Sequence, residues 1–258
     1  MKKENQIIKP KKKKSFWGEV IGILIAILIA LGIRSFVFEP YNIPSGSMFP
    51  TLLVGDYLVI TKHDYGYSRY SFPFSLPIIP DGKRAFPKTP KQGDVVIFRM
   101  TPDMNPQIAT PIDYIKRVIA LPGDTVQMLN GVLYINDKPV QRRFAGYKKM
   151  KTQHRGEQTY TQYTETLPNG FYHDIWEITD HAPLDNTPKV TVPAGHVFMM
   201  GDNRDDSLDS RYFGPVSMDK LEGKARLIFY STNGNGNFWE FWRWNEFIRK
   251  NRVFTLIR

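Results

Sequence analysis

The 258-residue sequence contains no cysteine, which excludes disulfide bonds, thiolate metal sites and a thiol nucleophile. Its five histidines lie far apart, and none has a metal-binding spacing such as H-E-x-x-H. The sequence therefore predicts no metal site and no bound cofactor. A Ser-His-Asp triad stays open at this stage, because its members need only be neighbours in space.

The central part of the chain lacks an excess of positive charge, although the formal net charge is +10. Residues 1–14 carry seven lysines and one glutamate, and residues 238–258 carry five basic and two acidic side chains. These ends hold +6 and +3, so residues 15–237 hold only about +1. Basic charge beside apolar and aromatic residues at both ends indicates the lipid bilayer as a partner and no nucleic acid.

One long apolar run is present, at Val20–Ile33, and it is too short to span a bilayer alone. Together with the aromatic residues on both sides it covers residues 16–38, which make about 35 Å of helix. We expect a single transmembrane helix over 16–38, between a basic tail at 1–15 and an extracytoplasmic domain at 39–258. The lysines at 9–14 place the N-terminus in the cytoplasm.

Two other structures share this basic and apolar order. A removable signal peptide needs a small-x-small site just past the run, and Arg34–Phe38 offers none. A buried core helix leaves the flanking lysines unexplained. We therefore favour an uncleaved anchor, which puts residue 47 just outside the far face of the membrane.

Beyond residue 38 no stretch has a sustained 3.6-residue apolar period, so we predict a mainly β body. Three Gly-Asp pairs, at 55–56, 93–94 and 123–124, each precede a run of β-branched or aromatic residues. Asn130-Gly131 lies between two such runs and predicts a two-residue hairpin.

Two segments break this pattern. Residues 62–92 are rich in Tyr, Pro and Ser, and predict a surface excursion. Residues 141–190 are polar and Tyr-rich, with scattered short extended pieces. We place them in an inserted β subdomain at about 125–195.

The segment Pro44–Leu52 (PSGSMFPTL) presents a serine, Ser47, between two prolines. The prolines fix φ, and Gly46 permits a sharp turn or a close approach to a ligand. A serine on such a stiff turn is one way to build a nucleophile. It is also one way to build an ordinary loop, which the segment taken alone favours.

A base for this serine is offered by Asp113–Leu121, a predicted strand that carries Lys116 and Arg117 on opposite, mainly apolar faces. Burial in an apolar pocket lowers the pKa of a lysine, and a near-neutral lysine can take a proton from a serine. The alternative is an exposed Lys-Arg pair on an edge strand.

The segment Gly201–Arg211 holds four acids, two arginines and two serines. A calcium loop is one interpretation, but the EF-hand pattern fails because no glutamate stands at the twelfth position. We favour Asp–Arg pairing within a structured loop, with a plain polar turn as the alternative.

The C-terminal segment 238–258 interleaves aromatic and basic residues. Trp239, Trp242 and Phe247 are placed to share one helical face. Aromatic rings beside basic groups suit a lipid headgroup zone. A tail that packs on the core is the other interpretation.

Taken together, these residues resemble the bacterial type I signal (leader) peptidases, the membrane-bound Ser–Lys proteases. The match comprises the single anchor and four motifs: PSGSMFPTL at 44–52, GDVVIF at 93–98, YIKRVIALPGD at 114–124 and GDNRDDSLDSR at 201–211. The chain departs from the family at Asp206, where asparagine is usual, and in its single membrane segment, where better-known members often have two. The resemblance implies a signal-peptidase-like antiparallel β catalytic domain.

The resemblance also implies roles for individual residues. Ser47 is the acylating nucleophile and Lys116 the general base, while the Ser45 hydroxyl and the Ser47 N–H form the oxyanion hole. Ser207 orients the Lys116 amine. The implied ion pairs are Asp202 with Arg117 and Asp209 with Arg211, and the implied lining of shallow apolar substrate pockets is Ile43, Pro44, Tyr114 and Ile115.

The implied activity is that of a serine endopeptidase that removes N-terminal signal peptides from exported preproteins after Ala-x-Ala-type sites. Its expected location is the extracytoplasmic (periplasmic) side of the inner membrane, with the secretion translocon as a further partner. Two alternatives stay open: a specialised Ser–Lys maturation peptidase of a conjugation or pilus system, and a non-catalytic membrane-tethered β-domain that binds exported chains.

Overall fold

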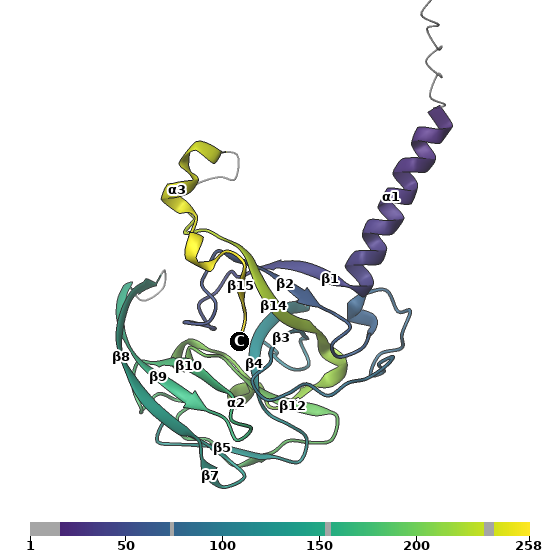
Figure 1. Ribbon diagram of the computed structural model, residues 1–258. Coiled ribbons are helices and arrows are strands. Elements are labelled where there is room, and N and C mark those ends of the chain that lie inside the picture. The colour runs from purple at the N-terminus through teal and green to yellow at the C-terminus, as the bar shows by residue number, and fades with distance from the viewer. Residues whose placement is uncertain (1–15, 73–74, 153–155, 235–239) are drawn as a thin grey trace, which may run out of the picture.

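The computed structural model describes residues 16–72, 75–152, 156–234 and 240–258, and shows a β body from which one helix projects (Figure 1). Helix α1 (Phe16–Phe36) ends two residues before the predicted end of the anchor, because Phe38 already pairs with Thr61 in the first strand. The predicted basic tail lies outside the described residues.

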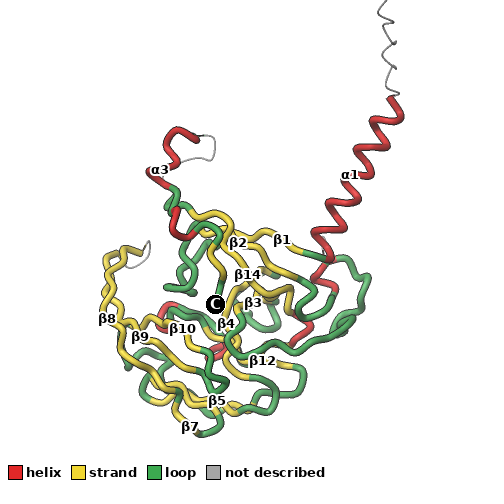
Figure 2. Tube along the Cα trace, viewed as in Figure 1, coloured by secondary structure: helices red, strands yellow, loops and turns green. Residues whose placement is uncertain are grey.

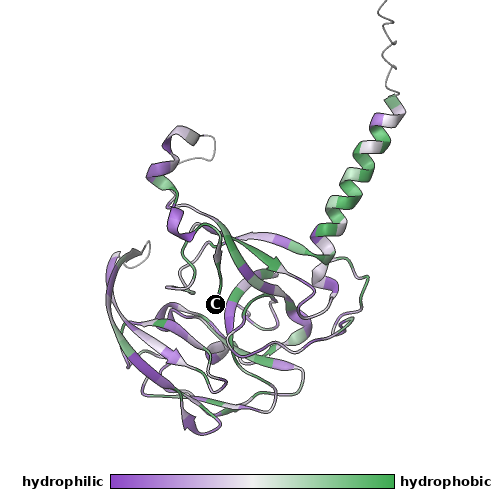
Figure 3. Ribbon diagram, viewed as in Figure 1, coloured by the Kyte–Doolittle hydropathy of each residue, from purple (hydrophilic) through white to green (hydrophobic). Residues whose placement is uncertain are grey.

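The apolar run of α1 has no protein packed around it. Figure 3 shows apolar residues along most of the helix, and none of its apolar window is buried within the protein. A core helix of this composition would be enclosed by other elements, so burial in a core does not account for α1. Its length and composition suit a membrane span.

The body is built from antiparallel strands, most of them in one eight-stranded sheet with the order β1-β2-β14-β3-β4-β12-β13 and with β15 paired to β14 (Figure 2). This confirms the prediction of a mainly antiparallel β body. The strands of this sheet are β1 (Phe38–Asn42), β2 (Asp56–Thr61), β3 (Val95–Met100), β4 (Ile112–Ala120), β12 (His196–Met200), β13 (Val216–Ser217), β14 (Leu221–Ser231) and β15 (Thr255–Leu256).

Two smaller sheets occupy the predicted insertion. They are a three-stranded sheet of β8 (Gln141–Thr152), β9 (Gly156–Thr166) and β10 (Tyr172–Glu177), and a four-stranded sheet of β5 (Thr125–Leu129), β6 (Val132–Ile135), β7 (Lys138–Pro139) and β11 (Val190–Thr191). The expectation of only short extended pieces in this polar region is wrong, because β8 and β9 form the longest ladder of the fold. Cross-strand pairing satisfies the backbone of these strands whether or not their side chains are apolar.

Short helical turns complete the fold, and they are η1 (Arg69–Ser71), η3 (Arg204–Asp206), α2 (Ser210–Phe213), η4 (Met218–Lys220), η5 (Phe241–Arg243), α3 (Trp244–Phe247) and η6 (Lys250–Arg252). The predicted common face of the C-terminal aromatics is wrong for the two that can be compared. Trp242 is 67% exposed, whereas Phe247 is 1% exposed. Trp239 lies outside the described residues.

The turns before the strands owe their shape to aspartate and asparagine side chains. In all three Gly-Asp pairs the carboxylate accepts a hydrogen bond from the N–H three residues earlier: Asp56 from Leu53 at 2.7 Å, Asp94 from Lys91 at 3.0 Å and Asp124 from Leu121 at 2.9 Å. Asn130 and Gly131 have φ of 48° and 74°, the left-handed values that a two-residue hairpin requires. The predicted turns are therefore confirmed.

The excursion at 62–92 has little regular structure but is attached to its surroundings. The Tyr67 hydroxyl donates to the Phe36 carbonyl at 2.9 Å, at the end of α1. The Arg84 guanidinium donates to the carbonyl groups of Tyr65 and Leu221, both at 2.7 Å. These contacts fix the excursion between the foot of the helix and the main sheet.

Candidate active site

The fold brings the serine of the turn and the lysine of β4 together. Lys116 Nζ lies 2.7 Å from Ser47 Oγ, within hydrogen-bonding distance. Lys116 is 4% exposed, and Ser47 is half-buried. The alternative of an exposed Lys-Arg pair on an edge strand is wrong, because β4 lies between β3 and β12 and both side chains are buried.

Burial lowers the pKa of the Lys116 amine to about 8. The carboxylates of Asp209 and Asp202 act in the opposite direction, and the Arg211 guanidinium adds to the lowering. The charges around Lys116 thus oppose one another in their effect on its pKa, and desolvation is the largest cause of the shift. An amine in this state is neutral often enough near pH 7 to accept a proton from a serine.

The serine turn, Pro44–Leu52, is held in place by its own apolar residues. Met48 and Leu52 are fully buried in the core cluster that also contains Ile43 and Ile115. The Leu52 N–H donates to the Met48 carbonyl at 2.9 Å. Ser47 therefore lies between Ile43 and Met48, which are both anchored in the core.

A buried ion pair joins the Gly201–Arg211 segment to β4. Arg117 donates from Nε and Nη2 to the two carboxylate oxygens of Asp202, at 2.8 and 2.7 Å. The Thr51 hydroxyl also donates to Asp202, at 2.5 Å. Burial alone would raise the pKa of Asp202, but Arg117 outweighs it and holds the pKa below its usual range.

A second ion pair lies within the segment itself. Arg211 donates to both oxygens of Asp209, at 2.9 Å in each case, and the Gly201 N–H donates to the same carboxylate at 3.0 Å. The Ser207 hydroxyl also donates to Asp209, at 2.8 Å. In the described part of the chain no hydrogen bond joins Ser207 to Lys116.

Space is tight where this segment meets the serine turn. A Cβ at Gly201 would lie 2.3 Å from Ser207 Oγ and 2.4 Å from the Ser47 carbonyl oxygen. Any side chain here would displace one of them. Gly201 is therefore required by close approach.

The four expected substrate-lining residues lie on the two segments that carry Ser47 and Lys116. Ile43 and Ile115 pack in one core cluster, while Tyr114 packs on the neighbouring cluster with its ring centroid 5.4 Å from Lys116 Nζ. Pro44 is exposed, as is Ser45. The apolar side chains beside the dyad are thus mostly part of the core, with the exposed residues at the rim.

Sequence reasoning missed a second ionic network behind the site. Arg204 and Glu165 are both fully buried and form a bidentate ion pair, at 2.9 and 2.5 Å. His173 Nε2 lies 3.6 Å from Glu165 and 3.8 Å from Asp202. Burial lowers the pKa of His173 to about 4, so this histidine is neutral at pH 7. Arg204 stands within a segment already noted for its charges, but its partners come from the insertion and have no local signal.

No histidine in the described residues hydrogen-bonds Ser47, whose partner is Lys116. His154 lies outside them. The calcium interpretation of Gly201–Arg211 loses two of its ligands, since Asp202 and Asp209 are engaged by arginines. The part of the chain that the structure describes contains no group of three or more acidic and histidine side chains that could hold a metal ion.

Asp206 and the serine turn both contact the insertion. The Tyr160 hydroxyl donates to Asp206 at 2.8 Å, so the extra charge is tied to β9. Tyr160 stacks on Trp176 with centroids 5.0 Å apart, and Trp176 meets the ring of Phe49 at 5.7 Å. The insertion therefore packs against the serine turn through the contact between Trp176 and Phe49.

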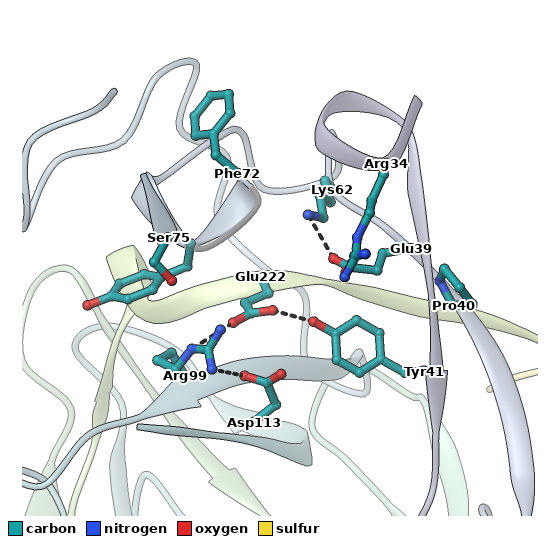
Figure 4. A pocket seen from close by; sticks show the side chains of 11 residues that line it. Arg34, Glu39, Pro40, Tyr41, Lys62, Phe72, Ser75, Arg99, Asp113 and Glu222 are labelled. Atoms are coloured by element: carbon teal, nitrogen blue, oxygen red, sulfur yellow. Dashed lines mark hydrogen bonds and ion pairs between the residues drawn. The ribbon is translucent and has the colours of Figure 1, made fainter. Parts of the chain in front are cut away.

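A polar pocket of about 210 Å³ lies at the foot of α1 (Figure 4), and no residue assigned a catalytic role lines it. Tyr41 donates to Glu222 at 2.5 Å, while Arg99 reaches Glu222 at 3.1 Å and Asp113 at 2.9 Å. Burial, and then the Asp113 carboxylate, raise the pKa of Glu222 to about 8. The charges in this pocket are thus paired with one another.

An antiparallel β body behind one apolar helix, with a serine hydroxyl against a buried lysine amine, is the architecture of a membrane-anchored serine hydrolase. The family model described as signal peptidase, peptidase S26, matches residues 17–230. The chain belongs to this family, as the resemblance of its motifs predicts. It is accordingly a serine peptidase of the signal peptidase class.

Two relatives from Rickettsia agree with this assignment. The chain is 38% identical to signal peptidase I of Rickettsia akari, over 94% of this chain and 92% of the relative. It is 40% identical to signal peptidase I of Rickettsia typhi, over 86% of this chain and 83% of the relative. The crystal structure of a signal peptidase I from Enterococcus faecalis V583 matches with 26% identity and a TM-score of 0.30, over 53% of this chain and 97% of that one.

Proposed function

We propose that this enzyme removes signal peptides from exported preproteins after Ala-x-Ala-type sites, with Ser47 as nucleophile and Lys116 as general base. The observation that carries the proposal is the 2.7 Å distance between Ser47 Oγ and Lys116 Nζ, at an amine whose burial lowers its pKa. Family membership favours an enzyme over a non-catalytic binding domain.

Acylation begins with Lys116 neutral. Its lone pair accepts the Ser47 proton while Oγ attacks the carbonyl carbon of the scissile bond, giving a tetrahedral oxyanion and a lysine ammonium. The ammonium then returns the proton to the departing amine, so the peptide bond breaks and an acyl ester remains on Ser47. Water attacks this ester while Lys116 takes its proton, and the ammonium returns that proton to Ser47 Oγ as the ester bond breaks. The signal peptide leaves with a new carboxyl terminus, and Ser47 and neutral Lys116 are restored.

The oxyanion forms beside the serine turn. The Ser47 N–H and the Ser45 hydroxyl donate to it, and donors aimed at developing charge are commonly the largest single contribution to such catalysis. Ser45 is exposed, so its hydroxyl is accessible to a bound substrate. The Ser207 hydroxyl donates its proton to Asp209, which holds it beside Gly201. Its oxygen stays available as an acceptor, and we assign it the orientation of the Lys116 amine during the reaction.

The two ion pairs hold the Gly201–Arg211 segment against β4. Breaking one partner of a buried pair leaves an uncompensated charge, which costs more than the pair itself contributes. Asp202 with Arg117 and Asp209 with Arg211 are thus structural supports of the dyad.

Substrate specificity comes from apolar side chains on the two segments flanking the dyad. These are Ile43, Pro44, Tyr114 and Ile115. Because Ile43 and Ile115 are almost fully buried, they offer little surface to a substrate, which suits the small side chains of an Ala-x-Ala site.

The proposed topology puts residues 1–15 in the cytoplasm, α1 across the inner membrane and residues 39–258 on the periplasmic side. The unburied apolar surface of α1 supports a membrane span, and the lysines before it support this orientation. Lipid contact at the C-terminal segment is supported by exposed Trp242, Phe254 and Leu256 beside basic residues. The secretion translocon delivers the substrate to this face.

The chain allows a direct test of topology because it has no cysteine. Two variants with one cysteine each, Lys9→Cys and Lys149→Cys, are treated with a membrane-impermeant maleimide from the periplasmic side. Only Lys149→Cys should react before the membrane is opened. Reaction of the cysteine at position 9 would contradict the orientation.

The activity test uses the purified full-length chain, an Ala-x-Ala preprotein, and the variants Ser47→Ala and Lys116→Ala. The wild type should cleave, and both variants should fail. Lys149→Ala, which removes an exposed lysine on β8, is the control and should cleave normally. Cleavage by Lys116→Ala would refute the dyad. Activity on one specialised substrate but not on the generic preprotein would instead favour a conjugation or pilus peptidase.

A further inference from the structure

We propose that Asn203 is a positioning residue that aims the Ser47 N–H at the oxyanion. The inference rests on the proposed roles of Ser47 and Lys116 and adds a residue to which the motif resemblance assigned no part. Asn203 is 1% exposed and lies on the far side of the serine turn from solvent.

Asn203 holds the backbone on both sides of the Ser47 Cα. Its side-chain Nδ2 donates to the Gly46 carbonyl at 3.0 Å, and its backbone N–H donates to the Ser47 carbonyl at 3.1 Å. The Gly46 carbonyl also accepts the Phe49 N–H at 3.0 Å, within the turn itself. Asn203 supplies the donors from outside the turn.

The hydrogen bond from Asn203 to the Gly46 carbonyl also fixes the direction of the Ser47 N–H, which belongs to the same peptide group. In a trans peptide the carbonyl of one residue and the N–H of the next lie in one plane and point in opposite directions. A donor fixed on the Gly46 oxygen therefore sets the direction of the Ser47 N–H. A rotation of this peptide would turn the proposed oxyanion donor away from the substrate.

The Gly46–Ser47 peptide needs such a support. Gly46 has no side chain of its own to restrain it, since a Cβ there would lie 2.7 Å from the ring of Phe49. Glycine gives the backbone more freedom than any other residue. The asparagine amide replaces the restraint that a side chain cannot provide.

Asn203 is in turn held by the inserted sheet. The Trp176 N–H donates to the Asp202 carbonyl at 2.9 Å, and Trp176 forms a bridge with Asn203. The next residue, Arg204, is bound to Glu165 of β9. A continuous chain of contacts thus connects strands β9 and β10 of the insertion, through Asn203 and Gly46, to the proposed oxyanion donor.

Asparagine suits this position because of its donor. Nδ2 bonds Gly46, whereas Oδ1 is buried and has no hydrogen-bond partner among the described residues. Aspartate would direct an acceptor at a carbonyl oxygen and bury a charge. Leucine has a similar size without the donor.

The test compares Asn203→Leu and Asn203→Ala with wild type on an Ala-x-Ala peptide. We expect kcat to fall by about 10- to 100-fold, less than the loss of a whole oxyanion donor, with KM changed by about 2-fold or less. Affinity for a peptide aldehyde, which forms a tetrahedral adduct on Ser47, should fall in parallel with kcat/KM. The pH midpoint set by Lys116 should not move, because the dyad is left intact.

Two further measurements separate this from a structural role. Asn105→Leu removes another buried asparagine, one that accepts from the Gln107 N–H, and should leave kcat unchanged. In a double-mutant cycle with Ser45→Ala, the losses should be non-additive because both residues serve one oxyanion.

Other outcomes overturn the proposal. A shifted pH midpoint would show that Asn203 acts through Lys116, and a change confined to KM would assign it to substrate binding. Loss of cooperative unfolding in both Asn203 variants would make it a fold determinant only. If the assignment of Ser47 and Lys116 is itself wrong, the Lys116→Ala variant will still cleave, which distinguishes that outcome from failure of the Asn203 proposal.

Discussion

The pH dependence of cleavage gives the sharpest test of the lysine base. Burial lowers the pKa of Lys116 from 10.5 to about 8. A general base must be unprotonated, so kcat/KM should rise with pH and level off above the pKa. We expect a tenfold rise per pH unit below about pH 8 and a plateau above it.

The size of the effect follows from the pKa. At pH 7 an amine with its ordinary pKa is neutral in about 1 molecule in 3,000, whereas Lys116 is neutral in about 1 in 10. The lowered pKa corresponds to about 3 kcal/mol of preference for the neutral form. Burial thus supplies roughly 300-fold more competent base at neutral pH.

The assay measures kcat/KM for a fluorogenic Ala-x-Ala peptide between pH 6 and 10 in the full-length enzyme. Lys116→Arg keeps the positive charge at all these pH values and should be inactive throughout. Arg211→Gln removes a charge that lowers the pKa of Lys116, and it frees Asp209, which raises it. Both changes have the same sign, so the midpoint should move to higher pH.

Three results would refute this reasoning. A flat profile from pH 6 to 9 would mean that no lysine titrates in the rate-determining step. A midpoint near 10.5 in the wild type would mean that water reaches the amine freely. A midpoint moved to lower pH by Arg211→Gln would reverse the electrostatic assignment.

Further predictions concern the supports of the site. Arg117→Leu leaves the buried Asp202 carboxylate unpaired and should lower the free energy of unfolding by about 3–5 kcal/mol in denaturant titrations. Gly201→Ala places a methyl against the serine turn and should abolish cleavage, whereas Gly22→Ala meets no atom within 4 Å and should cleave normally. Since the raised pKa of Glu222 means that folding favours its protonated form, its contribution to stability falls as pH rises. Glu222→Gln should therefore raise Tm more at pH 9 than at pH 5.

Each of these has a contrary outcome. Unchanged stability in Arg117→Leu would show that solvent reaches Asp202 or that another cation replaces the arginine. Normal cleavage by Gly201→Ala would show that the serine turn yields without loss of geometry. A greater gain in Tm at pH 5 for Glu222→Gln would reverse the direction assigned to its pKa.

The β class of the fold and several of its turns could be predicted from local sequence signals. The β class followed from the lack of helical periodicity, and the hairpin at Asn130-Gly131 followed from two residues that tolerate positive φ. The long strands β8 and β9 were not anticipated, because their sequences are mainly polar and show no clear apolar alternation.

The residues of the candidate site could be predicted only in part from local sequence signals. From pattern alone, Ser47 was an ordinary loop residue and Lys116 an exposed charge, and the resemblance of motifs reversed both. Asn203 went unassigned because nothing in its neighbours reveals the direction of its amide. His173 belonged to no motif in the sequence, whereas the fold buries it between two carboxylates.

What the sequence alone determined is what depends on neighbours along the chain. The apolar helix needs only a contiguous run, and each Gly-Asp turn closes on an N–H three residues away. The tertiary structure decided the chemistry of the site, because it depends on groups far apart in the chain. Lys116 meets Ser47 across 69 positions, and Asn203 reaches Gly46 across 157. Desolvation of an amine and the aim of a peptide N–H arise only when such distant groups are packed together.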